Sequence, residues 1–324
     1  MSNQLILTVT RACNLRCSYC PTAKDGWPSL RKEDVRKAID LFVHRFGGGS
    51  IKLFGGEPLL VPDIVQEACL YASKIDSIEK IYLSTNGLPL TEELIVWIKK
   101  QKKLILTISI DGGSKDHNKM RRSLQGASDS YEHIMSLRSS LLKLPRLVIT
   151  QTIAPATAGR AHENFLHLYE QGFRKFNFLP GFYIPWRTNQ LELLEENLQL
   201  IAKSISSLWE QNRYVYIRNL FIQAPTPFFN TGVIVDSDRS IHANNLGLSE
   251  KLTNLRSKTQ LGTLDVPPTR VQLQQKAQEI NSILESELPS NIWKSTMAAD
   301  AALSRFCAQL WPKFLRYKKR KAFV

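Results

Sequence analysis

The sequence has few cysteines, five in 324 residues, and three of them fall within residues 13–20. No apolar run reaches the roughly 18 residues that a membrane-spanning helix needs. The N-terminus, "MSNQLILTVT", lacks the basic segment and the long apolar segment of a signal peptide. These absences argue against a membrane protein and against a disulfide framework, and they predict a cytoplasmic chain whose thiols stay reduced.

Negative charge is also scarce. The chain has 43 Lys and Arg residues but only 29 Asp and Glu residues, which gives a formal net charge of +14. Much of the excess lies in the C-terminal "KFLRYKKRKAFV". Such a segment is compatible with a solvated tail, an acidic peptide partner or nucleic acid. Since no aromatic-rich basic stretch or known RNA-binding module accompanies it, nucleic acid is the less favoured partner.

Strand-like and helix-like segments alternate through about residue 185. The strands are expected at 4–10, 50–54, 80–85, 104–110, 146–153 and 175–179. Helices are expected between them, with Ser29 and Thr91 as two of the N-caps and one helix over 130–144. This alternation predicts parallel strands with helical crossovers, in a partial barrel or an open doubly wound sheet. In both, chemistry belongs at the carboxyl ends of the strands.

The pattern changes after residue 186, so we expect a core at 1–185 and an extension at 186–324. The extension should hold a long helix, a hairpin at 234–245 that turns at Asp236–Arg239, and C-terminal helices over 269–287 and 291–320. The predicted fold class is therefore α/β, a partial (β/α)6 TIM barrel with a C-terminal α+β extension.

The cysteine cluster "RACNLRCSYCP" places Cys13, Cys17 and Cys20 directly after the first strand. Thiolates at this spacing can hold zinc or iron, and either a structural zinc site or an iron–sulfur cluster normally takes four protein ligands. Cys69 lies among apolar residues and Cys307 is far along the chain, so both are expected to be small buried hydrophobic residues. Three thiolates leave one metal position open, which is typical of catalytic rather than structural sites.

The stretch "CNLRCSYC" resembles the CxxxCxxC signature of the radical S-adenosylmethionine (radical SAM) superfamily, and the resemblance covers about residues 4–185. It implies one 4Fe–4S cluster held by the three cysteines, with the fourth iron left to chelate S-adenosylmethionine (SAM). One electron then cleaves SAM to methionine and a 5′-deoxyadenosyl radical, which abstracts a substrate hydrogen. Tyr19 matches a position near the adenine.

Companion motifs at the ends of the later strands resemble the SAM-contacting motifs of that superfamily. "GGEP" matches the motif for the amino group, to which Glu57 would offer its carboxylate, and "STNG" and "SIDG" suit ribose. "HNKMR" supplies His117 and Arg121, an i, i+4 pair on one helical face whose arginine would meet the SAM carboxylate, although Arg122 could take its place. The residues implied for the SAM site are Tyr19, Gly55, Gly56, Glu57, Pro58, Ser84, Asn86, Ser109, Asp111, His117, Arg121, Gln151 and Leu179. An ordinary turn at "GGEP", a surface histidine and a core leucine at position 179 stay open as alternatives, and no catalytic acid or base is identified.

The hairpin "IVDSDRSIHANN" and the later "LGTL" resemble the SPASM or Twitch extension of radical SAM enzymes that modify ribosomal peptides. Register puts Arg239 at a glycine and Asn244 where the first cysteine would be, so the extension, about residues 230–265, is expected to lack an auxiliary cluster. The resemblance therefore implies a peptide maturase with one cluster. The best specific hypothesis is a splicease that excises tyramine and leaves an α-keto-β-amino acid. Alternatives are a single-cluster epimerase, an enzyme acting on a small molecule or nucleotide, and a non-enzymatic metal-binding structural protein.

The expected partners follow from this interpretation. The substrate would be a precursor peptide, and an external donor would supply the electron. Because the first strand begins at residue 4, we expect no N-terminal leader-recognition domain, and a small partner protein would bind the leader in trans, with the leader added to a sheet edge.

Overall fold

A computed structural model describes residues 3–124, 129–221, 233–243 and 253–322. The chain divides into two compact units, each built from segments that are distant in the sequence. The first unit comprises Met1–Ile108, Arg122–Leu147 and Phe228–Leu288, and the second comprises Ser109–Arg121, Val148–Pro227 and Pro289–Val324. The expected division at residue 185 stays a prediction.

The first unit contains a sheet in the order β12-β11-β10-β1-β3-β4-β5. Its strands are β1 (Gln4–Thr10), β3 (Gly49–Gly55), β4 (Ile78–Thr85), β5 (Leu104–Ser109), β10 (Val233–Val235), β11 (Ser240–His242) and β12 (Gln260–Thr263). Strand β1 pairs in parallel with both β3 and β10, and β4 pairs in parallel with β3 and β5. β11 is antiparallel to both β10 and β12, as the expected hairpin requires.

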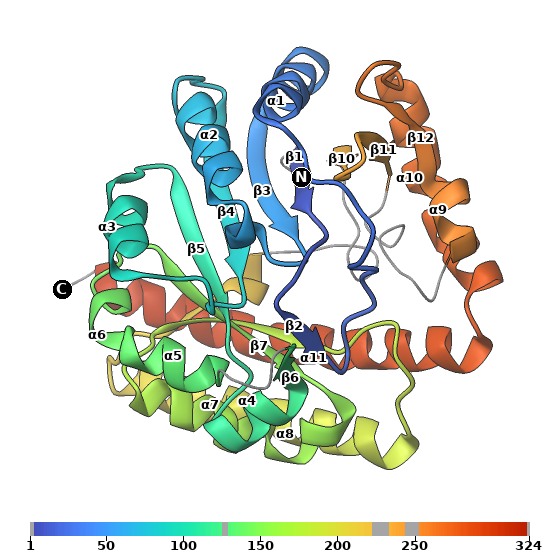
Figure 1. Ribbon diagram of the computed structural model, residues 1–324. Coiled ribbons are helices and arrows are strands. Elements are labelled where there is room, and N and C mark those ends of the chain that lie inside the picture. The colour runs from blue at the N-terminus through green and yellow to red at the C-terminus, as the bar shows by residue number, and fades with distance from the viewer. Residues whose placement is uncertain (1–2, 125–128, 222–232, 244–252, 323–324) are drawn as a thin grey trace. The chain divides into compact units, whose positions relative to one another are not determined.

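Alternation along β1 separates two faces of this sheet. Leu5, Leu7 and Val9 are fully buried, and the helices α1 (Lys32–Phe46), α2 (Pro62–Ser73) and α3 (Glu92–Lys100) run alongside these strands (Figure 1). Burying each such side chain contributes roughly 1.5–3 kcal/mol. The register pairs Thr8 with Phe54 on the opposite face, and it also pairs Ser84 with Thr107. Ser84 of the "STNG" motif therefore lies on this opposite face, which we call the polar face, and the "GGEP" and "STNG" turns lie at the carboxyl ends of β3 and β4.

The helix starts test two sequence expectations. Thr91 caps α3, because its hydroxyl accepts a hydrogen bond from Leu94 N at 3.2 Å, as predicted. The prediction that Ser29 caps the first helix is wrong, because its hydroxyl donates to Thr10 Oγ1 at 2.8 Å instead. Arg31 is the cap residue, and its N–H donates to the carboxylate of Asp34.

The other short elements of the first unit connect its strands. They are β2 (Leu15–Cys17), η1 (Pro58–Leu60), β6 (Arg121–Ser123), α5 (Ser130–Ser136), α6 (Arg138–Leu141), α9 (Thr253–Thr259) and α10 (Arg270–Glu287). The single helix expected over 130–144 is interrupted at Leu137, which ends α5 and precedes α6.

The second unit contains three parallel strands, β7 (Leu147–Ile153), β8 (Lys175–Pro180) and β9 (Tyr216–Ile217). Its helical elements are α4 (Ser114–Met120), η2 (Pro155–Arg160), α7 (Ala161–Glu170), α8 (Thr188–Glu210), η3 (Arg218–Phe221) and α11 (Ser290–Ala322). The core is aromatic, because Phe165 of α7 packs edge-on against Phe176 and Phe178, with ring centroids 5.1 and 5.7 Å away.

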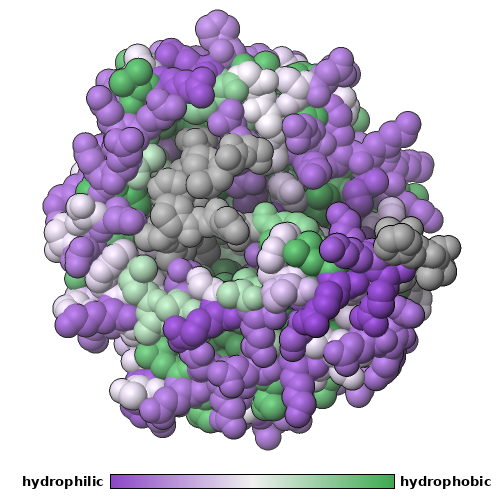
Figure 2. Space-filling model, turned by 180° about the vertical axis from the view of Figure 1, so that it is seen from behind, coloured by the Kyte–Doolittle hydropathy of each residue, from purple (hydrophilic) through white to green (hydrophobic). Residues whose placement is uncertain are grey.

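The predicted α/β class is confirmed. Each of the six expected strands is present and is followed by a helix, and most strand pairs are parallel. Among the described helices, none is long and apolar enough to cross a membrane. On the face shown in Figure 2, hydrophilic residues predominate and hydrophobic residues form small patches.

Candidate functional site

The three predicted ligand cysteines lie on a loop that leaves the carboxyl end of β1, which we call the cysteine loop (residues 11–20). All three side chains are half-buried and free of disulfides. A turn brings the last two together, since Cys20 N donates to the carbonyl of Cys17 at 3.1 Å. The loop is thus an ordered segment that displays thiols at the end of the sheet where parallel α/β folds place their chemistry.

The "GGEP" turn clamps the start of the cysteine loop. Gly56 N donates to the carbonyl of Thr10 at 2.9 Å, and Glu57 N donates to that of Ala12 at 2.8 Å. A Cβ on Gly56 would lie 2.2 Å from the carbonyl oxygen of Arg11, so only glycine allows this approach. The tandem glycines therefore serve the contact between two backbones that leads into Cys13.

Glu57 is fully buried, and its carboxylate is engaged inside the protein. It accepts hydrogen bonds from Leu59 N at 3.0 Å, from the Thr85 hydroxyl at 2.8 Å and from Asn86 N at 2.6 Å. These bonds tie the "GGEP" turn to the "STNG" turn that ends β4. Glu57 therefore braces the two turns, and the offer of its carboxylate to the SAM amino group stays a prediction.

Asn86 connects the "STNG" turn to the cysteine loop. Its amide nitrogen donates to Asn14 Oδ1 at 2.8 Å and lies 3.8 Å from the Sγ of Cys13, within hydrogen-bonding range of sulfur. Ser84, the other residue expected there, is half-buried on the polar face of β4. Of the residues predicted from the first three motifs, the structure thus brings Cys13, Gly56, Glu57 and Asn86 into one hydrogen-bonded group.

The cysteine loop fits an iron–sulfur cluster chemically. The Sγ of Cys13 accepts hydrogen bonds from Leu15 N at 3.4 Å and from Asn86, the kind of donors that stabilise cluster thiolates. Burial raises the pKa of Cys13, while the Leu15 N–H and the nearby Lys24 ammonium oppose that rise. Cys13, Cys17 and Cys20 would hold the cluster, which supplies the electron for SAM cleavage when bound.

Among the described residues, no three His, Cys, Asp or Glu side chains are grouped closely enough to hold a single metal ion. The two remaining cysteines lie on helices, Cys69 on α2 of the first unit and Cys307 on α11 of the second. Cys69 is fully buried in α2, as predicted, and burial raises its pKa to about 12. Cys307 is only half-buried on α11, and burial likewise raises its pKa to about 12.

In the second unit, the "SIDG" and "HNKMR" residues converge on one carboxylate. Asp111 is 2% exposed and accepts two hydrogen bonds from the guanidinium of Arg121, both at 3.0 Å. It also accepts from Thr152 N at 3.1 Å, and its own N–H donates to Nδ1 of His117 at 3.2 Å. His117 is completely buried, so the surface-histidine alternative is wrong.

Arg121 does not share the helical face of His117, because α4 ends at Met120 and Arg121 begins β6. Its guanidinium is 7% exposed and engaged with Asp111, whereas Arg122 is exposed. The sequence alone left the choice between these two arginines open. The structure shows that Arg121 is the one built into the second unit, and its contact with SAM stays a prediction.

We expect Arg121→Ala to lower the free energy of unfolding by about 3 kcal/mol or more, because it leaves the buried Asp111 carboxylate without its cation. Arg122→Ala, at the exposed neighbouring position, should change it by less than about 0.5 kcal/mol. Urea unfolding followed by tryptophan fluorescence measures both. Equal effects of the two substitutions would contradict the assignment.

The residues predicted on β7 and β8 divide between two faces. Gln151 is 1% exposed, pairs with Phe178, and donates to the carbonyl of Ala161 at the start of α7 at 2.9 Å. Leu179, which is half-buried, pairs with the buried Thr152 on the opposite face. Thr152, rather than Gln151, therefore shares the face of Leu179. Ser109 is half-buried at the end of β5.

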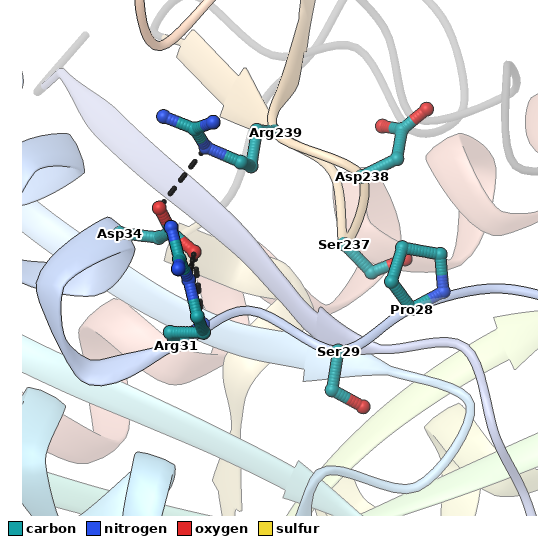
Figure 3. Close-up of a pocket in the computed structure, with 7 residues that line it drawn as sticks. All are labelled: Pro28, Ser29, Arg31, Asp34, Ser237, Asp238 and Arg239. Carbon is teal, nitrogen blue, oxygen red and sulfur yellow. Dashed lines mark hydrogen bonds and ion pairs between the residues drawn. The ribbon is translucent and has the colours of Figure 1, made fainter.

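The expected hairpin is formed by β10 and β11, with a turn closed by a hydrogen bond from Arg239 N to the carbonyl of Asp236 at 2.9 Å. Arg239 adopts φ +73°, the left-handed region that favours glycine, which agrees with the register that placed it at a glycine position. Asn244 lies outside the described residues. Beside this turn is a pocket of about 250 Å³ that also contacts Pro28 and Asp34 (Figure 3).

Acid should destabilise the hairpin through His242, whose pKa burial lowers to about 4. An unfolded histidine titrates near 6.5. The stabilisation is thus complete above pH 6.5 and is lost as pH falls toward 4. By pH 5 the unfolding free energy has fallen by about 2 kcal/mol. His242→Gln should remove this share of the acid sensitivity, measured as the difference in unfolding free energy between pH 7 and pH 5. An unchanged difference would show that His242 does not stay neutral.

Comparison with known proteins identifies the segment that carries the cysteine loop. The model of the Radical SAM superfamily matches residues 7–146. The match spans less than half of the chain. The matched residues include the three cysteines, the "GGEP" and "STNG" turns, and the "SIDG" and "HNKMR" motifs. The match does not include the hairpin formed by β10 and β11.

Curated relatives that match part of this chain are named GTP 3′,8-cyclase. The protein from Clostridium botulinum strain Okra is 32% identical over 145 residues, which are 43% of this chain and 43% of the relative. That from Actinobacillus pleuropneumoniae serotype 5b is 26% identical over 226 residues, 62% of this chain and 63% of the relative. The chain thus spans less than half the length of the first of these relatives.

Solved structures share the fold over a longer stretch. Native anSMEcpe with bound AdoMet superposes with a TM-score of 0.74 at 16% identity, covering 99% of this chain and 100% of that chain. Streptococcus suis SuiB bound to the precursor peptide SuiA gives 0.56 at 13% identity, covering 74% and 59%. At these identities the likeness shows the fold alone.

Proposed function

We propose that this chain is a radical SAM enzyme that cleaves SAM reductively and modifies a ribosomally made precursor peptide. The observation that carries the first half is the cysteine loop, whose three half-buried thiols lie at the end of β1 between the "GGEP" turn and Asn86. Its test is anaerobic reconstitution with iron and sulfide, followed by reduction and an assay for 5′-deoxyadenosine. Absence of that product from protein with a full cluster would overturn the proposal and leave the structural metal-binding alternative.

The peptide substrate is supported by the extent of the fold likeness. The anSMEcpe chain has been solved with peptides named Cp18Cys and Kp18Cys, and SuiB with its precursor SuiA. The superposition with anSMEcpe extends over nearly the whole chain, beyond the radical SAM domain. A precursor peptide substrate, a leader-binding partner in trans and an external electron donor therefore stay part of the proposal.

Within this class, peptide splicing with loss of tyramine is the specific reaction we propose, on a single cluster held by Cys13, Cys17 and Cys20. The support is the small number of cysteines, since Cys69 is buried inside α2 and Cys307 stands alone on α11. Mass spectrometry of the precursor after reaction tests it. A mass loss equal to tyramine is expected, whereas an unchanged mass with deuterium uptake from D₂O would indicate epimerisation.

A nucleotide substrate is the second candidate, because the curated relatives that match the domain are GTP 3′,8-cyclases. The two candidates are separated by incubating the reconstituted, reduced protein with SAM and either GTP or the precursor peptide. Conversion of GTP to a new product, with no change in the peptide, would favour the nucleotide reaction.

A further inference from the structure

A buried ionic group joins the cysteine loop to the C-terminal hairpin. It consists of Arg11, Trp27, Asp236 and Arg256, all within the first unit. Arg11 is 1% exposed and Asp236 is completely buried. Cys13 follows Arg11 after a single residue, so this group lies at the base of the predicted cluster site. Arg11 and Asp236 lie in the quoted cysteine and hairpin motifs, but neither they nor Arg256 was expected to contact the cluster or SAM.

The contacts of Arg11 fix the direction of its side chain. Its guanidinium forms a two-pronged pair with Asp236, from Nε to Oδ1 at 3.1 Å and from Nη2 to Oδ2. Its Cζ lies 3.5 Å from the centre of the Trp27 ring. A planar guanidinium held at its edge by a carboxylate and on its face by an indole has little freedom to rotate.

Asp236 is held in turn from the hairpin side. It accepts from Ser237 N at 2.7 Å and from Arg256 Nη1 at 2.7 Å. Arg256 also bonds Asp238 and the Ser240 hydroxyl, and its Cζ lies 4.7 Å from the Trp27 ring. The hairpin turn is further tied to the start of α1 by the pair between Arg239 and Asp34 (Figure 3). The carboxylate that receives Arg11 is therefore itself immobilised.

The cysteine loop thus has anchors at two consecutive residues, Arg11 and Ala12. The backbone of Ala12 is held by Glu57 N at 2.8 Å, and the side chain of Arg11 is held by Asp236. Buried ion pairs are poor sources of stability compared with apolar packing, but they are directional and fix one arrangement. Such a pair, two residues before Cys13, is suited to setting how the loop leaves β1.

We propose that Arg11, Asp236 and Arg256 are positioning residues that hold the cysteine loop in the conformation that binds the cluster. The hairpin thereby contributes to the cluster site through an ionic contact rather than through a ligand of its own. This inference rests on cluster binding by the three cysteines, but on no substrate, so a failure of the peptide reaction leaves it standing.

The first test needs no cluster. Alkylation of the metal-free protein by iodoacetamide is followed at each cysteine by peptide mass spectrometry, in wild type, Asp236→Asn and Asp265→Asn. Asp265 is the matched control, since it pairs with Lys37 and Arg239 at an exposed site near the same turn. We expect Asp236→Asn to speed alkylation of Cys13, Cys17 and Cys20 by about tenfold, with buried Cys69 unchanged, and Asp265→Asn to have no effect. Equal rates in wild type and Asp236→Asn would overturn the proposal.

If Asp236→Asn also speeds alkylation of Cys69, the variant is globally unfolded. Arg11→Lys then replaces it in the alkylation test, because lysine keeps the charge but loses the two-pronged geometry.

The second test measures iron content and the electron paramagnetic resonance spectrum of the reconstituted, reduced protein with and without SAM. We expect the variant to bind less iron or to show an altered SAM-dependent spectrum, with partial recovery in Asp236→Glu. A folded variant with wild-type iron, spectrum and alkylation rates would refute the positioning role.

Discussion

Cys17→Ala is expected to abolish the 4Fe–4S cluster and, with it, cleavage of SAM. Cys17 lies at the end of β2, and its carbonyl accepts the bond from Cys20 N that closes the turn of the cysteine loop. Loss of a contact that merely supports a metal ligand already costs about 10–100-fold in affinity or activity, so loss of a ligand should cost more than about 100-fold. Iron should fall from about four atoms per chain to below about one.

The measurements are iron content, the visible absorption of the cluster and the yield of 5′-deoxyadenosine after anaerobic reconstitution. Cys307→Ala is the matched control, because it removes a half-buried cysteine from α11 and should leave all three unchanged. Wild-type iron in Cys17→Ala, or loss of iron in Cys307→Ala, would show that the ligand set has been assigned incorrectly.

Gly56→Ala is expected to disrupt the cluster site without touching a ligand. Its Cβ would lie 2.2 Å from the carbonyl oxygen of Arg11 and 2.4 Å from that of Ala12, and backbone atoms cannot move aside as a flexible side chain can. The cysteine loop would have to shift, breaking the bonds that Gly56 N and Glu57 N donate to it. We expect a loss of about 3 kcal/mol in unfolding free energy and reduced iron binding.

Gly113→Ala is the control for that experiment, since the nearest atom to its added Cβ is His167 Cδ2 at 3.8 Å, an ordinary contact. Its unfolding free energy should stay within about 0.5 kcal/mol of wild type. Chemical denaturation and iron content measure both variants. If Gly56→Ala behaved like Gly113→Ala, the close contact between the "GGEP" turn and the cysteine loop would be wrong.

Local signals made the strands and the motif positions predictable. Apolar runs such as "LILTISI" specify buried strands whatever follows, and Thr91 is followed by acidic residues that favour a helix start. Like Thr91, Ser29 is a hydroxyl residue shortly before a helix-like segment. Its hydroxyl is taken by Thr10, a tertiary contact that the surrounding sequence does not reveal.

The contacts of the charged side chains could not be predicted from the sequence. Arg11 and Asp236 are separated by 225 residues, so no spacing rule connects them. Glu57 carried a motif, but whether its carboxylate faces a ligand or braces two turns depends on where Thr85 and Asn86 fall in space. Arg121 looked helical by its i, i+4 spacing, and only the end of α4 at Met120 directs it to Asp111 instead.

The parallel pairing of β1 with β10 has a consequence for the order of folding. Leu5 lies opposite Val233, so the first strand to be synthesised acquires its second neighbour only when the last third of the chain appears. At the usual rate of synthesis, roughly 10–45 s separate the two strands. During that interval one edge of β1 is open to wrong pairing, and the cysteine loop lacks its anchor on the hairpin. Before residue 236 is synthesised, the cysteine loop has its backbone contact with Glu57 but not its ion pair with Asp236. We therefore expect productive cluster insertion to follow completion of the chain.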